Sequence, residues 1–266
     1  MLFSTSTIAA VALAFASTVS AHATMFGVSV NGQDQGDGRD KYIRTPASND
    51  PVRDLKSPNL VCNTNGGKPA PSFVKAPAGA SLTSRWFHFN PNDPNDIIDP
   101  SHKGPIITYI APFTEGNGAG PMWSKIDEQG FENGEWAIIK MRNNGGKVNF
   151  KLPSTLAPGQ YLIRQELLAL HMADFRGDQV EGRGAESYPS CFQVEVTGNG
   201  EAIPDQDFDF NRGYTYDNPG LFFNIHIPFD KYTPPGPPVW KSRRMRKMKR
   251  PKRPHFINTV VPEARI

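Results

Sequence analysis

Hydrophobic and polar residues alternate over several short stretches, beginning with residues 24–30 (TMFGVSV), which run into the turn dipeptide Asn31-Gly32. Later stretches are rich in β-branched and aromatic residues and are bounded by clusters of Asn, Asp, Gly and Pro. They cover residues 81–89, 105–110, 135–141, 148–152, 160–170 and 191–196. Short strands joined by turn clusters predict an all-β sandwich.

The stretch 160–170 (QYLIRQELLAL) leaves an alternative open. Leu167, Leu168 and Leu170 follow no strict period of two, so a helix competes with a strand, although the surrounding β pattern favours the strand. Between the stretches, the sequence predicts three long loops, of a length that is commonly functional. These loops cover residues 32–61, 114–134 and 175–189.

Composition agrees with the pattern. The 266 residues include 24 Gly and 25 Pro, an enrichment that disfavours a helical bundle. Residues 204–240 are rich in Pro, Gly, Asp and aromatic residues without strand alternation, which favours an extended segment wrapping the sandwich over a flexible linker. The sequence contains no P-loop, dinucleotide-binding, HExxH or GxSxG motif, so several common enzyme classes are poor candidates.

Residues 1–21 carry no charged side chain and end in the small residues Val19-Ser20-Ala21. This pattern predicts a secretory signal peptide that is cleaved after Ala21, because the apolar run is shorter than the roughly 18 residues of a membrane span. Cleavage would make His22 the N-terminal residue, whose α-amine and imidazole together can chelate a metal ion. Secretion also predicts a disulfide between Cys62 and Cys191, with a nucleophilic cysteine as the alternative.

Charge is distributed unevenly. Ten Lys or Arg and one Glu lie in residues 241–266, although the whole chain carries a formal charge of only +3. The sequence therefore predicts an acidic domain over residues 22–240 and a basic, disordered tail over residues 241–266. Such a tail would attract anionic polymers in a salt-dependent way.

Several segments resemble one family when they are taken in order. They are His22 and residues 101–111 (SHKGPIITYIA), 159–171 (GQYLIRQELLALH), 184–191 (GAESYPSC) and 232–240 (YTPPGPPVW). Together they resemble the fungal lytic polysaccharide monooxygenases of auxiliary activity family nine, formerly glycoside hydrolase family sixty-one. The resemblance covers residues 22–240 without large gaps.

The resemblance implies a secreted copper enzyme on an immunoglobulin- or fibronectin-like β-sandwich with long loops. Such an enzyme cleaves β-1,4-glucan, as cellulose and in some members hemicellulose, by oxidation at C1 or C4. It takes one copper per chain, electrons from an extracellular reductant, and O2 or H2O2 as co-substrate. The expected partner is a crystalline or amorphous polysaccharide surface, with no nucleic acid and no membrane, and the protein is expected to be a monomer.

The resemblance also implies roles for single residues. His22, through its α-amine and Nδ1, and His102, through Nε2, would form a T-shaped histidine brace, a nitrogen set that suits copper. Tyr188 would be the axial phenol, and His171 would hydrogen-bond species bound at the open metal position. Sugar-stacking tyrosines are expected in the aromatic wrap, or these rings instead pack the wrap onto the sandwich. They are Tyr214, Tyr216 and Tyr232.

Two positions depart from the family pattern. Glu186 stands where the family usually has Gln, and Gln165 stands where it commonly has His. A deprotonated Glu186 only accepts hydrogen bonds, whereas a protonated Glu186 could donate one and deliver a proton during oxygen reduction. His88 and His226 are interpreted as structural. Two other functions stay open: a copper-binding protein with little oxidative activity, and a non-catalytic carbohydrate-binding module.

Overall fold

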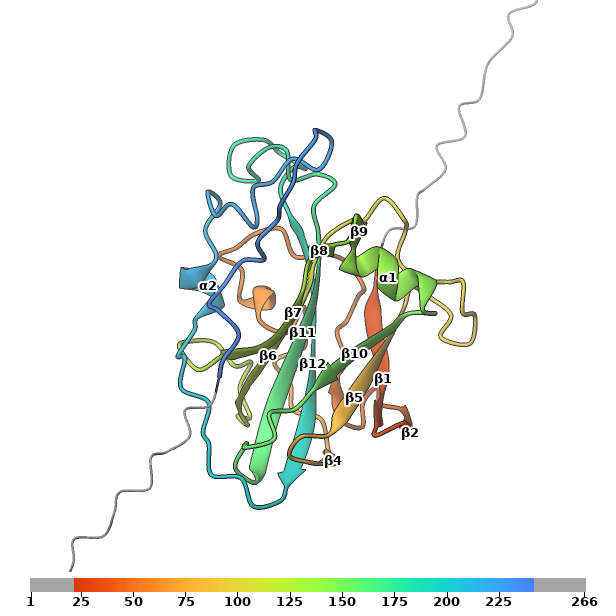
Figure 1. Ribbon diagram of the computed structural model, residues 1–266, viewed down its shortest axis with the longest axis vertical. Helices are drawn as coiled ribbons and strands as arrows, with labels where there is room; N and C mark the ends of the chain where they lie inside the picture. Colours follow the sequence, from red (N-terminus) through yellow and green to blue (C-terminus); the bar gives the residue numbers. More distant parts are fainter. Residues whose placement is uncertain (1–21, 242–266) are drawn as a thin grey trace, which may run out of the picture.

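Residues 22–241 are described by a computed structural model, in which two β-sheets pack face to face (Figure 1). The smaller sheet has the order β10-β5-β1-β2, and the larger has the order β3-β12-β11-β6-β7, with β4 pairing parallel to β12. The smaller sheet consists of β1 (Thr24–Val30), β2 (Gln33–Asp37), β5 (Ser81–Phe87) and β10 (Lys147–Lys151). The larger consists of β3 (Ile43–Arg44), β4 (Val74–Pro77), β6 (Ile106–Pro112), β7 (Ser124–Gln129), β11 (Gly159–Ala169) and β12 (Glu186–Thr197). The prediction of an immunoglobulin-like β-sandwich is confirmed.

Short elements complete the described part of the chain. They are a two-stranded hairpin of β8 (Phe131–Glu132) and β9 (Glu135–Trp136), the 3-10 helix η1 (Pro58–Leu60), and the helices α1 (Ala137–Asn143) and α2 (Phe210–Gly213). The predicted signal peptide, and the basic tail beyond Lys241, lie outside the described residues. No helix within residues 22–241 is long and apolar enough to cross a membrane.

Three strands of the smaller sheet, β1, β5 and β10, were predictable because burial alternates along much of each. In β10, Val148 and Phe150 are buried while their neighbours are exposed. In β1 the register shifts between Met25 and Gly27, and this irregularity explains why the alternation in its sequence is only partial.

The run 160–170 is a strand, as its context predicted. Nine consecutive residues of β11 are buried, so no period of two is expected there. One face packs in the core between the sheets, and the other is covered by the C-terminal segment, drawn in blue in Figure 1. That covering layer includes buried aromatic and aliphatic residues of the wrap, namely Phe210, Tyr214, Leu221 and Tyr232.

Three predictions of secondary structure are wrong. The expected loop 32–61 contains β2 and β3. Residues 135–141 were expected to form one strand, but only Glu135–Trp136 is extended and α1 follows. Ala137, Ile138 and Met141 are the buried residues of α1, and their spacing fits one face of a helix rather than the period of two of a strand. The expected loop 114–134 contains β7, whose polar sequence SKIDEQ gives no strand signal.

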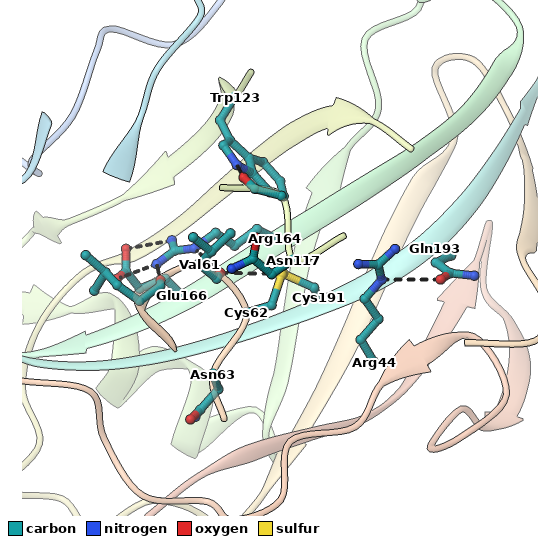
Figure 2. The surroundings of a disulfide bond; sticks show 12 residues. Arg44, Val61, Cys62, Asn63, Asn117, Trp123, Arg164, Glu166, Cys191 and Gln193 are labelled. Carbon is teal, nitrogen blue, oxygen red and sulfur yellow. Dashed lines mark hydrogen bonds and ion pairs between the residues drawn. A yellow bond between two sulfur atoms is a disulfide. The ribbon is translucent and has the colours of Figure 1, made fainter. Parts of the chain in front are cut away.

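The predicted disulfide between Cys62 and Cys191 is present, with a Cα–Cα distance of 5.3 Å. It joins the loop after η1 to the middle of β12 (Figure 2). Beside it, β11 carries a fully buried ion pair in which the Arg164 guanidinium lies 2.9 Å from the Glu166 carboxylate. The charged groups of both residues are removed from water, so their partners must compensate for the lost hydration.

Those partners come from three other segments. Arg164 donates to the carbonyl oxygens of Leu60 and Val61 at 2.8 and 2.7 Å. The Glu166 carboxylate accepts hydrogen bonds from Ser187 of β12 and, at 2.9 Å, from Tyr214 of the wrap. The ion pair therefore fixes the disulfide loop, β12 and the wrap relative to β11.

Replacing Glu166 with Gln is expected to lower the free energy of unfolding by about 3–5 kcal/mol, because it leaves the Arg164 charge buried without an anion. Denaturant unfolding measures this loss. The matched control is Asp178→Asn, which disrupts the more accessible pair of Asp178 with Arg176 and should change stability little. Equal effects of the two substitutions would contradict the structural role of the buried pair.

Candidate metal centre

The ends of three neighbouring strands bring His102, His171 and Glu186 together. In the antiparallel pairing of β6 with β11, Ile106 lies opposite Leu167, and the Leu170 amide donates to the Lys103 carbonyl beyond the strands. Continuing this register by one residue places His102 opposite His171. Glu186 begins β12 and pairs with Ala169 of β11, so it lies at the same end of the sheet.

One potential ligand atom from each of these three residues lies within 4.8 Å of the other two. The rings of His102 and His171 have centroids 4.1 Å apart. His102 Nε2 is 3.4 Å from one Glu186 oxygen, and His171 Nε2 is 3.9 Å from the other. Tyr188 is buried beside them and its hydroxyl donates to Glu186 at 2.7 Å. The structure therefore gathers four of the predicted site residues.

Glu186 is held in its ionised form. Burial alone would raise its pKa, but the close approach of His102 Nε2, the hydrogen bond from Tyr188 and the charge of Arg53 lower it to about 2. Arg53 Nη2 lies 2.5 Å from Glu186 Oε1. The carboxylate therefore accepts hydrogen bonds, and the alternative of a protonated Glu186 that donates is not favoured by these surroundings.

Two residues beside Glu186, His171 and Tyr188, are kept uncharged. Burial lowers the pKa of His171. Burial and the nearby Glu186 carboxylate raise the pKa of Tyr188 above its ordinary value, so Tyr188 stays a phenol at neutral pH. A neutral imidazole and a phenol beside a carboxylate form a hydrogen-bonding environment without excess positive charge.

His22 lies outside the group of three and has its own partners. Its Nε2 is 2.9 Å from Asp50 Oδ1, and its ring faces His88 with centroids 6.4 Å apart. Asp50 is close in sequence to Val52, which pairs with Ser187, and to Arg53, which contacts Glu186. The segment 50–53 therefore links His22 to the start of β12.

These contacts leave particular ring nitrogens available. The Asp50 contact occupies Nε2 of His22, which leaves Nδ1 free of it. Ser101 Oγ lies 3.1 Å from Nδ1 of His102, while the buried Nε2 has no hydrogen-bond partner among the described residues. A carboxylate or hydroxyl on one imidazole nitrogen commonly orients the other toward a metal. The donor set thus fits a copper ion, which imidazole nitrogen ligates well.

The prediction of sugar-stacking rings is wrong for two of the three tyrosines. Tyr214 is fully buried and donates to Glu166, and Tyr232 is buried and donates to the Gly220 carbonyl at 2.7 Å. Both rings pack the wrap onto the sandwich, which was the alternative. Tyr216 is partly exposed, and its hydroxyl contacts Asp54 at 3.1 Å.

Sequence reasoning missed other residues near the centre. Phe175 and Phe222 are 52% and 43% exposed and line a shallow crevice with Tyr216, Arg53 and Leu55. Arg53 was also missed, although a carboxylate predicted beside a metal site is a signal to search for a cation. His226 was taken as structural, and its Nε2 does lie 2.9 Å from the His171 carbonyl oxygen.

Two imidazoles and a carboxylate at one end of a β-sandwich, with a phenol beside them, form a group able to hold a metal ion, as in metalloproteins of the β-sandwich class. Comparisons with known proteins make the class more specific. A family model for Auxiliary Activity family 9 (formerly GH61) matches residues 22–232. The solved structure CvAA9A superposes with a TM-score of 0.80 at 52% identity, covering 82% of this chain and 98% of that chain.

Two named relatives agree. The AA9 family lytic polysaccharide monooxygenase A of Collariella virescens is 52% identical over 228 residues, which are 84% of this chain and 82% of that protein. The enzyme of the same name from Aspergillus terreus is 41% identical over 229 residues, 85% of this chain and 61% of that protein. The chain belongs to the auxiliary activity family nine lytic polysaccharide monooxygenases, and it is a copper-dependent polysaccharide monooxygenase.

The low pKa of Glu186 gives stability a defined pH dependence in the metal-free protein. Because the folded-state pKa of about 2 lies below the ordinary value of 4.5, ionised Glu186 stabilises the fold above about pH 4.5, and this contribution is lost as the pH falls toward 2. This lowering of the pKa corresponds to about 3 kcal/mol of the free energy of unfolding. Glu186→Gln should remove that part of the pH dependence.

Denaturant unfolding of chelator-treated wild type and Glu186→Gln between pH 2 and 7 measures the effect. Glu132→Gln is the control, because that carboxylate is exposed on β8. If the stability difference between wild type and Glu186→Gln stayed constant across this range, Glu186 would not be held ionised as described.

Proposed function

We propose that this chain is a secreted enzyme that cleaves β-1,4-glucan, principally cellulose, by oxidation at C1 or C4, with hemicellulose as a second substrate class. The observation that carries the proposal is the meeting of His102, His171, Glu186 and Tyr188 at one end of the sandwich in a member of this family. A cellulose-active polysaccharide monooxygenase from M. thermophila is similar in structure, with a TM-score of 0.67 at 28% identity. That likeness supports cellulose as the substrate.

The proposed copper ligands are the α-amine and Nδ1 of His22 and Nε2 of His102. The contacts of His22 Nε2 with Asp50 and of His102 Nδ1 with Ser101 support this choice, because they leave the proposed ligand nitrogens unengaged. When bound, copper supplies the one-electron redox chemistry that activates O2 or H2O2. Removal of the signal peptide after Ala21 would free the α-amine.

The remaining residues of the centre act by orientation and hydrogen bonding. Tyr188 presents a buried phenol beside these residues, and its hydroxyl donates to Glu186. His171, with its lowered pKa, is a neutral imidazole that can exchange hydrogen bonds with an oxygen-containing co-substrate. Its main-chain oxygen is contacted by His226, which fixes the turn that carries the ring.

The proposed substrate surface lies beside this centre. Phe175, Phe222 and Tyr216 present apolar rings along the crevice that Arg53 also lines. Flat rings cover the apolar faces of pyranose units at low entropic cost, and a guanidinium donates to sugar hydroxyl groups. In this proposal the protein works as a monomer with an extracellular reductant and binds neither nucleic acid nor membrane.

A second function is favoured by one observation. Because Glu186 is ionised, it cannot donate a hydrogen bond to an oxygen species at the metal. A histidine-brace protein that binds copper but has little oxidative activity would tolerate such a group. Product analysis separates the two functions.

Incubation of copper-loaded protein with cellulose and a reductant should release oxidised oligosaccharides, which mass spectrometry identifies together with the carbon attacked. His102→Ala is the control and should release none, because it removes a proposed ligand. Stoichiometric copper binding without oxidised products from cellulose or hemicellulose would favour the copper-binding alternative.

Copper binding should require a free His22 amine. A form that retains one added Met before His22 has an amide in place of that amine and should bind Cu(II) more than about 100-fold more weakly. Losing a group that merely supports a ligand already costs about 10–100-fold. Isothermal titration calorimetry compares the two forms, and equal affinities would refute the brace.

A further inference from the structure

Arg53 contacts the metal centre from a segment that is fixed to β12. Val52 forms an antiparallel bridge with Ser187, with N–O distances of 2.7 and 3.1 Å for its two hydrogen bonds. The next side chain, Arg53, is about half exposed and reaches inward to Glu186 Oε1 at 2.5 Å. The bridge therefore sets the position from which the guanidinium approaches the carboxylate.

Both oxygens of Glu186 are engaged. Arg53 binds Oε1, and the Tyr188 hydroxyl donates to Oε2 at 2.7 Å. The carboxylate is only 4% exposed, so water can replace neither partner easily. Turning the carboxylate away would break a charge-assisted hydrogen bond in a buried place, where such bonds are strong.

The carboxylate also lies close to a proposed copper ligand. Glu186 Oε2 is 3.4 Å from Nε2 of His102. A carboxylate oxygen is itself able to ligate Cu(II), and an ionised Glu is anionic as such a ligand must be. If Glu186 turned toward the metal, its oxygen would fill a coordination position that the co-substrate needs.

We propose that Arg53 is a positioning residue that holds Glu186 as a hydrogen-bond acceptor and prevents it from becoming a ligand of the copper. This inference rests on the proposed His22 and His102 copper site. The guanidinium holds Oε1 by an ion pair, and the Tyr188 hydroxyl donates to Oε2, the oxygen nearest to His102. The open coordination position is thereby kept for the co-substrate.

The test compares Cu(II) electron paramagnetic resonance spectra of mature, copper-loaded wild type, Arg53→Gln, Glu186→Gln and the double variant. Arg53→Gln should shift the g and copper hyperfine values, because the released carboxylate adds an oxygen ligand. The double variant should give the spectrum of Glu186→Gln, since no carboxylate remains to be released. Arg53→Lys keeps the positive charge and should resemble wild type.

The matched control is Arg176→Gln. Arg176 lines the same crevice, but it pairs with Asp178 at 2.6 Å, so its spectrum should equal that of wild type. Calorimetry distinguishes an added ligand from a distorted site, because the two change the copper affinity in opposite directions. An added ligand should tighten copper binding by Arg53→Gln, whereas a distorted site would bind more weakly, by about 10–100-fold as for other lost outer-shell partners.

Two results would overturn the inference. One is an Arg53→Gln spectrum that superimposes on wild type, and the other is an Arg53→Gln shift that persists in the double variant. A failure of the proposed copper site is distinguishable from both, because the form with an added Met before His22 would then bind Cu(II) as tightly as the mature wild type.

Discussion

The buried ion pair of Arg164 and Glu166 is the interaction on which the arrangement of the site depends (Figure 2). A charge buried without partners is very costly, so every group that satisfies this pair is held in place. The partners belong to the loop before Cys62, to Ser187 in β12 and to Tyr214 in the wrap. Ser187 lies between Glu186 and Tyr188, so the ion pair that organises the outer core also fixes the start of the strand that carries both site residues.

Ion pairs also position the residues of the metal centre, closer to the surface. Asp50 contacts His22 and Arg53 contacts Glu186, so one short segment places charges of opposite sign on two sides of the centre. The bridge of Val52 with Ser187 ties that segment to the strand fixed by the buried ion pair. Ion pairs joined by this bridge therefore connect the core of the sandwich to the proposed copper ligands. The exposed rings of Phe175 and Phe222 line a crevice with Arg53, beside the last of these pairs.

Strands with one exposed face, such as β10, were predictable because burial alternates along them. The polar strand β7 and the helix α1 were not, because their burial depends on segments distant in sequence. At the site, the motifs containing His102, His171, Glu186 and Tyr188 predicted residues that do come together. Tyr214 and Tyr232 were misassigned and Arg53 was missed for the same reason, because the tertiary fold sets their partners. Arg53, for example, contacts Glu186, which is 133 residues away in the sequence, and Tyr214 contacts Glu166.

In the proposed centre, copper is held by His22 and His102, while Glu186 and His171 surround it without ligating it. A crystal structure of the mature, copper-loaded protein, with the metal located by its anomalous scattering, tests this most directly. The account predicts one copper bonded to the α-amine and Nδ1 of His22 and to Nε2 of His102, with Glu186 still paired to Arg53. Copper bound instead between His102, His171 and the Glu186 carboxylate would contradict it.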